Sequence, residues 1–173
     1  MKKTKRRVVR GTVVSVGLTA FIMGFIYFMS SMPGEDSSQM SNFIVRNLER
    51  LIPAFDYISG AAYQGAHELL SWMVRKGAHF TEYALLGFFL AAAFHTYLLP
   101  EDRTAGRLFR GFFFALLIGV AYAGTDEFHQ SFVSGRAAML MDVGFDGAGV
   151  FVGALLSTLF IGRTKIRYIN PKE

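Results

Sequence analysis

Side chains that can transfer protons are concentrated in two stretches of this chain, residues 76–90 (KGAHFTEYALLGFFL) and residues 124–153 (GTDEFHQSFVSGRAAMLMDVGFDGAGVFVG). Carboxylates and histidines are the commonest general acids and bases in proteins. The candidates for this role are His79, Glu82, Asp126, Glu127 and His129. They could form one site only if the fold brings the two stretches together.

Other polar residues in the same stretches could bind a ligand. Arg136 could hold a phosphate or a carboxylate, and Gly135 before it fits a turn that directs the arginine back over the site. Ser131 and Ser134 are weaker candidates for a nucleophile, because serines are common in loops. The remaining predicted ligand-binding residues are Lys76, Tyr83, Gln130, Asp142 and Asp146.

Three pairs of these side chains have the spacing that places two residues on one face of a helix. The pairs are His79 with Glu82, Asp126 with His129, and Asp142 with Asp146. Ionisable groups inside a membrane have to face the interior of a helix bundle and satisfy one another. We therefore expect one polar pocket where three helices meet.

Carboxylates outnumber cations in the expected pocket, with five acidic residues against Arg75, Lys76 and Arg136. Some of them must then be protonated, bind a metal ion or meet a cationic ligand. Two histidines with carboxylates would suit zinc or manganese, but the spacing does not match the HExxH signature, so a divalent metal is one alternative and no cofactor is assigned. A purely structural polar network is another. The two other histidines, His67 and His95, are assigned no role.

The composition indicates a membrane protein. Hydrophobic residues make up 52% of the 173 residues and charged residues only 18%, which is too apolar for an ordinary soluble surface. The absence of cysteine excludes disulfides and thiolate metal sites. The net charge of +5 does not indicate nucleic-acid binding, because the basic residues stand at the ends of hydrophobic runs. Residues 1–173 are interpreted as a single domain.

The hydrophobic runs predict an all-α protein with four membrane-spanning helices, at residues 11–29, 78–99, 110–130 and 143–161. The third run is apolar only as far as Gly124, about 22 Å of helix against a hydrocarbon core of about 30 Å, so its helix has to continue through Gln130. The same count places Asp146 one turn inside the fourth helix. Gly149 and Gly153 are expected to let this helix pack closely against a neighbour.

Residues 30–77 are expected to form an extracytoplasmic loop between the first two spans. A proline and a glycine early in this segment predict that residues 30–41 are an irregular exit loop. Residues 42–52 have an amphipathic pattern that is too short and too charged to span, so we expect a helix on the membrane surface. Another short helix is expected to begin at Ala66.

Charge bias predicts the orientation of the chain. Thirteen of its 18 lysines and arginines lie at the predicted inner ends of the helices, and five lie on the opposite side. Loops rich in lysine and arginine stay in the cytoplasm. Both termini are therefore expected to be cytoplasmic, with the polar pocket near the outer leaflet.

Residues 76–90 and 126–153 resemble the VanZ-like family of bacterial membrane proteins, and SSMPGEDSS after the first hydrophobic run is similar to the polar loop of that family. Ser134 stands where many members have proline, a difference that leaves the charged positions intact. The family is named for a member linked to low-level teicoplanin resistance. The resemblance thus implies a multi-pass protein of the bacterial cytoplasmic membrane that functions in the cell envelope.

Three kinds of function fit these expectations. The pocket could modify, or only bind, a lipid, a lipid-linked wall precursor or a lipoglycopeptide antibiotic such as teicoplanin. It could instead belong to an ion- or proton-coupled transporter, although four spans without a detectable inverted repeat argue against this. The sequence assigns neither a reaction nor an oligomeric state, and the lipid bilayer is the one partner that it predicts directly.

Overall fold

The computed structural model describes residues 2–98 and 105–169, and nearly all of these residues are helical. Four helices are long and apolar enough to cross a membrane, which confirms the predicted all-α membrane protein with four spans. The elements in chain order are α1 (Lys2–Ser30), α2 (Gly34–Glu49), the 3-10 helix η1 (Pro53–Tyr57), α3 (Gly60–Leu98), α4 (Ala105–Gln130) and α5 (Leu140–Ile169).

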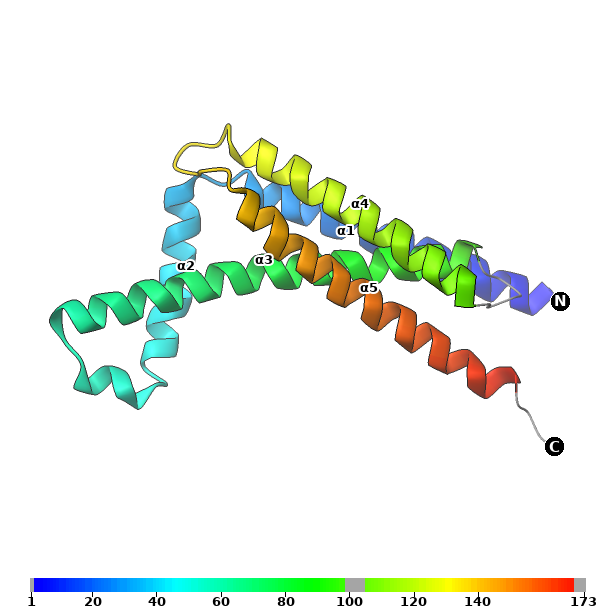
Figure 1. Cartoon of the computed structure of the whole chain (residues 1–173), viewed down its shortest axis with the longest axis horizontal. Coiled ribbons are helices and arrows are strands. Elements are labelled where there is room, and N and C mark those ends of the chain that lie inside the picture. The colour runs from blue at the N-terminus through cyan, green and yellow to red at the C-terminus, as the bar shows by residue number, and fades with distance from the viewer. Residues whose placement is uncertain (1, 99–104, 170–173) are drawn as a thin grey trace.

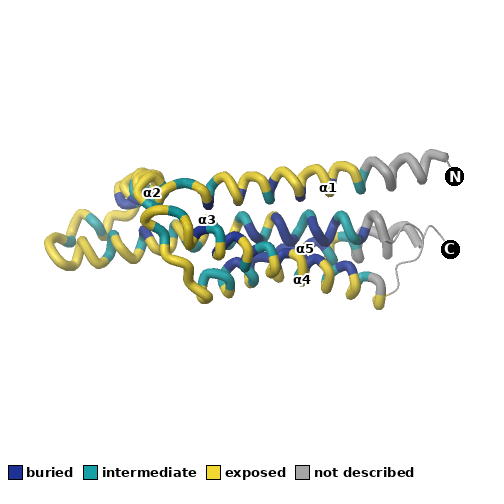
Figure 2. The backbone as a smooth tube through the Cα atoms, turned by 90° about the horizontal axis from the view of Figure 1, so that it is seen from above, coloured by how far each residue is buried: buried dark blue, intermediate teal, exposed yellow. Residues whose placement is uncertain are grey.

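The four long helices run along a common axis with α3 at the centre. Helix α3 packs against α1, α2, α4 and α5. The start of α1 and the end of α5 lie at one end of the bundle, whereas α2 stands across the axis at the other end (Figure 1). Buried residues lie where α3, α4 and α5 face one another, and the outward surfaces are exposed (Figure 2). These outward surfaces carry large apolar side chains such as Phe21, Leu117 and Phe160, as lipid contact requires.

Helices α3 and α5 cross so closely that two glycines of α5 have no room for a side chain. A Cβ atom on Gly149 would lie 2.5 Å from the carbonyl oxygen of Phe80, and one on Gly153 would overlap the carbonyl of Ala84. Close backbone approach of this kind is how small residues stabilise helix pairs in membranes. The predicted role of Gly149 and Gly153 in packing is confirmed.

The segment after the first span is more helical than predicted. Residues 30–41 were expected to be an irregular loop, but α2 already begins at Gly34. Pro33 precedes its first turn, where Glu35 and Asp36 favour a helix N-terminus. Two serine hydroxyls bond back along the helix, from Ser38 to the Gly34 carbonyl (2.8 Å) and from Ser41 to the Ser37 carbonyl (3.0 Å). The expectation of an irregular loop over residues 30–41 was therefore wrong.

The second predicted span is part of a much longer helix. The helix that begins at Ala66 and the span of residues 78–99 were treated as separate, but α3 continues through Gly77 from Gly60 to Leu98. Glycine weakens a helix without ending it, and nothing else interrupts the pattern. Since about 20 residues cross a bilayer, the first part of α3 extends beyond the bundle (Figure 1).

The other helix limits differ less from expectation. Helix α4 ends at Gln130, as the length of the apolar run required, but begins at Ala105 instead of residue 110. Helix α5 begins at Leu140, three residues before the predicted start, and continues past residue 161. The predicted end of the second span, at residue 99, lies outside the described residues, as do residues 100–104 after it.

The close crossing of α3 and α5 predicts a difference between two glycines of the same helix. Gly153→Ala should destabilise the protein by about 1–3 kcal/mol, because the added methyl group forces the helices apart. Gly144→Ala is the matched control, since a Cβ there meets nothing within 4 Å. Unfolding of both variants in mixed detergent micelles measures the difference. Equal stability of the two variants would contradict the packing described here.

Candidate functional site

A backbone contact joins the corner between α1 and α2 to the loop of residues 131–139. The Gly34 N–H donates to the Ser134 carbonyl at 2.9 Å, and a Cβ on Gly34 would overlap the backbone of Gly135. Gly135 itself has φ +73°, in the left-handed region that glycine adopts without strain. Glycine at both positions therefore lets two distant segments of the chain touch.

The arginine after this turn holds the contact in place. The Arg136 guanidinium donates to the carbonyls of Met29 (2.9 Å) and Met32 (3.0 Å) and to the Gln130 side-chain oxygen (3.1 Å). Helix C-termini leave their last carbonyls without partners within the helix. Arg136 supplies such a partner at Met29, bonds the chain just after α1 at Met32, and ties the end of α1 to the end of α4.

Arg136 remains charged while it makes these bonds. Burial lowers the pKa of its guanidinium, and the carboxylates of Asp126, Glu127 and Glu82 oppose that effect. The ordinary pKa of arginine is above about 12, so the group stays protonated at neutral pH. Its bonds to carbonyls are therefore charge-assisted and stronger than bonds between neutral groups.

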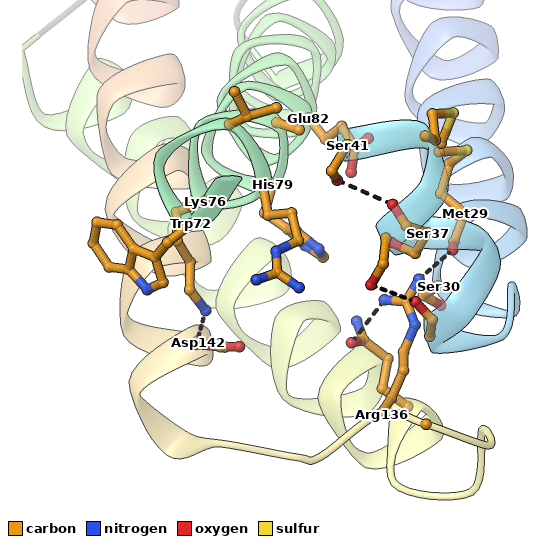
Figure 3. A pocket seen from close by; sticks show the side chains of 18 of the residues that line it. Met29, Ser30, Ser37, Ser41, Trp72, Lys76, His79, Glu82, Arg136 and Asp142 are labelled. Atoms are coloured by element: carbon orange, nitrogen blue, oxygen red, sulfur yellow. Dashed lines mark hydrogen bonds and ion pairs between the residues drawn. The ribbon is translucent and has the colours of Figure 1, made fainter. Parts of the chain in front are cut away.

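We call the hydrogen bonds of Arg136 to Met29, Met32 and Gln130 the Arg136 latch. A cavity of about 510 Å³ lies beside it. Helices α1, α2 and α3, the start of α5 and the loop of residues 131–139 contribute to its wall, as Figure 3 shows from close by. Its titratable lining residues are Arg75, Lys76, His79, Glu82, Arg136 and Asp142. Its apolar lining includes Ile26, Met29, Met40, Ile44 and Trp72.

The structure brings six of the eleven predicted site residues to the wall of this cavity. They are Lys76, His79, Glu82, Gln130, Arg136 and Asp142. Lys76 forms an ion pair with Asp142 that links α3 to α5. Glu82 makes no hydrogen bond or ion pair with any residue that the structure describes. His79 and Glu82 lie one turn apart on α3, as their spacing predicted (Figure 3).

Three further predicted residues are buried within the bundle. Asp126, Asp146 and Tyr83 are 4%, 2% and 0% exposed. Asp126 accepts a hydrogen bond from the Gln130 amide at 3.0 Å, and Asp146 Oδ1 lies 3.9 Å from His79 Nδ1, beyond hydrogen-bonding distance. The Tyr83 hydroxyl and the second oxygen of Asp126 have no hydrogen-bond partner within the described part of the chain. Buried polar groups thus continue inward from the cavity wall.

Glu127 and His129 do not line the cavity. Glu127 accepts a hydrogen bond from the Met139 N–H at 2.6 Å and so fixes the end of the loop before α5. His129 stacks on Tyr27 of α1, with 4.7 Å between ring centroids, and its Nε2 lies 3.2 Å from the Ser31 hydroxyl. Helix α1 packs over this turn of α4, and His129 contacts Tyr27 and Ser31 instead of facing the cavity. The histidine is therefore separated from the cavity, although it lies one turn from Asp126.

The bonds that these carboxylates make also bear on the predicted excess of acidic over basic residues in the pocket. Lys76, Gln130 and the Met139 N–H each satisfy one carboxylate, of Asp142, Asp126 and Glu127 in turn. Among residues 2–98 and 105–169, no three His, Asp or Glu side chains are grouped so that they could hold a metal ion. One cation and two neutral donors within the protein therefore meet part of the need for a partner that suggested a metal or a cationic ligand, whereas one oxygen of Asp126 has no hydrogen-bond partner among the described residues.

A family model described as VanZ/LLP1 matches residues 15–161 of the chain. The chain belongs to the VanZ/LLP1 family. The match includes every residue of the cavity wall and of the Arg136 latch. No curated protein and no solved structure matches the chain.

Part of the cavity wall in this VanZ/LLP1 protein was missed from the sequence. Trp72 lies on the same stretch of α3 as Lys76, as does Arg75, which was counted from the sequence only as a cation of the pocket. The serines on the other side come from the end of α1 and from α2. The missed serines are Ser30, Ser37, Ser38 and Ser41. The spacing of the last three would have placed them on one face of a helix, but the segment was read as a loop.

The latch predicts that charge alone cannot replace Arg136. Arg136→Lys should lower the free energy of unfolding by about 2 kcal/mol, because an ammonium group cannot bond to all three acceptors that the branched guanidinium group reaches. It should also accelerate hydrogen exchange at the backbone amides of residues 29–34. Arg46→Lys is the control, since Arg46 is an exposed arginine of α2. Unchanged exchange in Arg136→Lys would contradict the latch.

Proposed function

We propose that the protein binds an amphiphile of the cell envelope, a lipid or a lipid-linked wall precursor, and holds its phosphate-bearing headgroup in the cavity beside the latch. The observation that carries this proposal is the state of Arg75. It lines the cavity and is exposed, and it makes no ion pair or hydrogen bond with any residue in the described ranges. The other two cations of the wall, Lys76 and Arg136, already have protein partners.

The apolar part of the lining supports an amphiphile over a soluble anion. Met29 and Ile26 of α1 and Met40 and Ile44 of α2 line the same cavity as the charged groups. Binding sites for small molecules usually combine an apolar wall with a few polar groups that fix orientation. A headgroup could meet Arg75 while its chain follows the apolar wall toward the lipid-facing surface.

In this proposal the cavity opens at the outer leaflet of the bacterial cytoplasmic membrane. The support is the charge bias of the sequence, in which 13 of the 18 lysines and arginines stand at the predicted inner ends of the helices. The helix α2, which crosses the bundle axis at the cavity end (Figure 1), suits a position along the membrane surface.

A reaction at the same cavity is the second candidate. It is favoured by Glu82, which has no partner among the residues described and lies one turn from His79 on the cavity wall. Such a pair could act as general base and acid on a bound headgroup. Mass spectrometry of lipid recovered from the protein separates the two candidates. A new product that disappears in Glu82→Gln would support a reaction, and unchanged lipid would support binding alone.

A lipoglycopeptide such as teicoplanin also combines an apolar chain with a polar head and is the alternative ligand. In cells that express the protein, this alternative predicts resistance to teicoplanin but not to a glycopeptide without an acyl chain. In purified protein it predicts that teicoplanin displaces the bound lipid. Resistance without displacement would favour the lipid or wall precursor as the ligand.

The role of Arg75 can be measured through Trp72, the one tryptophan of the chain, which lines the cavity. Titration of the protein in zwitterionic nanodiscs with a short-chain prenyl diphosphate should change the Trp72 fluorescence. Arg75→Ala should weaken this binding by about 10- to 100-fold, because a charge-assisted contact to phosphate is lost. Arg50→Ala removes an equal charge just after α2, outside the cavity, and should have little effect. Equal affinities of the two variants would contradict the proposal.

A further inference from the structure

A second cavity, of about 850 Å³, lies between α2 and the part of α3 that extends beyond the bundle. It adjoins the first, because both are lined by Ser38, Ser41, Trp72 and Arg75. Its remaining wall contains the polar residues Asn42, His67, Glu68 and Ser71 together with Gly65 and Leu69. The two cavities therefore meet at Arg75, and the second adds four hydrogen-bonding side chains to the wall that they share.

A buried carboxylate orients the histidine of this second cavity. Glu49 of α2 is 9% exposed and lies 2.6 Å from His67 Nδ1, and its other oxygen accepts from the Tyr63 hydroxyl at 3.1 Å. A carboxylate can only accept, so Nδ1 carries the hydrogen. Its Nε2, the ring nitrogen that does not face Glu49, is left to hydrogen-bond a ligand, in the way that carboxylates orient ligand-binding histidines elsewhere.

Ser71 has an unsatisfied hydroxyl on the same wall. It is 8% exposed, it lines the cavity, and its oxygen has no hydrogen-bond partner among the described residues. A buried hydroxyl without a partner is costly, and an explanation is expected for each case in a native protein. His67, Ser71 and Arg75 are four residues apart in succession, so they form one row along α3.

The chemistry of this wall fits a sugar better than a second anion. Glu68 accepts hydrogen bonds, Nε2 of His67 can form one, and Asn42 both donates and accepts. Glu68 also disfavours a phosphate by repulsion. Trp72, 43% exposed, gives an aromatic surface on which the C–H face of a sugar ring can lie.

We propose that the second cavity binds a sugar attached to the phosphate that Arg75 holds. The inference rests on the proposed function and specifies its ligand as a glycosylated phosphate or diphosphate lipid. The phosphate lies at the junction of the cavities, the lipid chain follows the apolar wall of the first, and the sugar enters the second. Glu49 acts as a positioning residue for His67.

The test compares two ligands on the full-length protein in nanodiscs, followed by Trp72 fluorescence and by native mass spectrometry. One ligand is a short-chain prenyl diphosphate and the other is the same molecule with one N-acetylated hexose. The sugar should strengthen binding by about tenfold. Ser71→Ala should reduce this advantage to about threefold, and it removes a hydroxyl that has no protein partner, so the fold should be retained. His67→Ala should reduce it to about twofold or less.

Both variants should bind the diphosphate without sugar within about twofold of the wild-type affinity, a small change on the scale of one hydrogen bond. Gln64→Ala changes an exposed polar residue on the same part of α3 and should keep the tenfold advantage. If the plain diphosphate binds and the sugar adds nothing, the second cavity is not a sugar site and the proposed function stands. If Ser71→Ala weakens both ligands equally, the sugar assignment is likewise overturned. If neither ligand binds, the proposed function fails and this inference fails with it.

Discussion

The hydrogen bonding of the Arg136 guanidinium group is the interaction on which the cavity depends. The guanidinium joins the carbonyl of Met29 in the last turn of α1, and that of Met32 just after it, to the side chain of Gln130 at the end of α4. The backbone contact between Gly34 and the loop of residues 131–139 adds a second connection at the same place. Because α2 starts directly after that contact, the latch also sets where α2 lies against α3. Both cavities lie along α2, so their walls require this corner to be fixed.

The polar residues of this region divide into those that hold the fold and those that are free to meet a ligand. The ion pair of Lys76 with Asp142 and the bond of Glu127 to the loop backbone connect helices to one another or to loops. Arg75 and Glu82 have no such contact within residues 2–98 and 105–169. Satisfied groups make the corner rigid, and a rigid corner lowers the entropy cost of holding a ligand. The proposed binding therefore relies on the structural network and does not compete with it.

The number of spans, the end of α4 at Gln130 and the role of Gly153 followed from the sequence, because bilayer thickness and helical spacing are fixed quantities. Six predicted site residues line the cavity, but of the three predicted pairs only His79 with Glu82 has both members on its wall. His129 was misplaced because spacing cannot tell which neighbouring helix packs over a given turn. The helical serines of α2 and the continuous α3 were missed, since turn-forming residues and Gly77 weaken a helix without preventing it.

The most direct measurement of the central claim uses the absence of cysteine in the chain. A single cysteine at residue 38, in the variant Ser38→Cys, lies where the two cavities meet. The account predicts that a membrane-impermeant maleimide labels it in intact cells, and that prenyl diphosphate slows the labelling of purified protein in nanodiscs. Labelling only after the cells are permeabilised, or labelling that the ligand does not slow, would contradict a ligand-binding cavity at the outer leaflet.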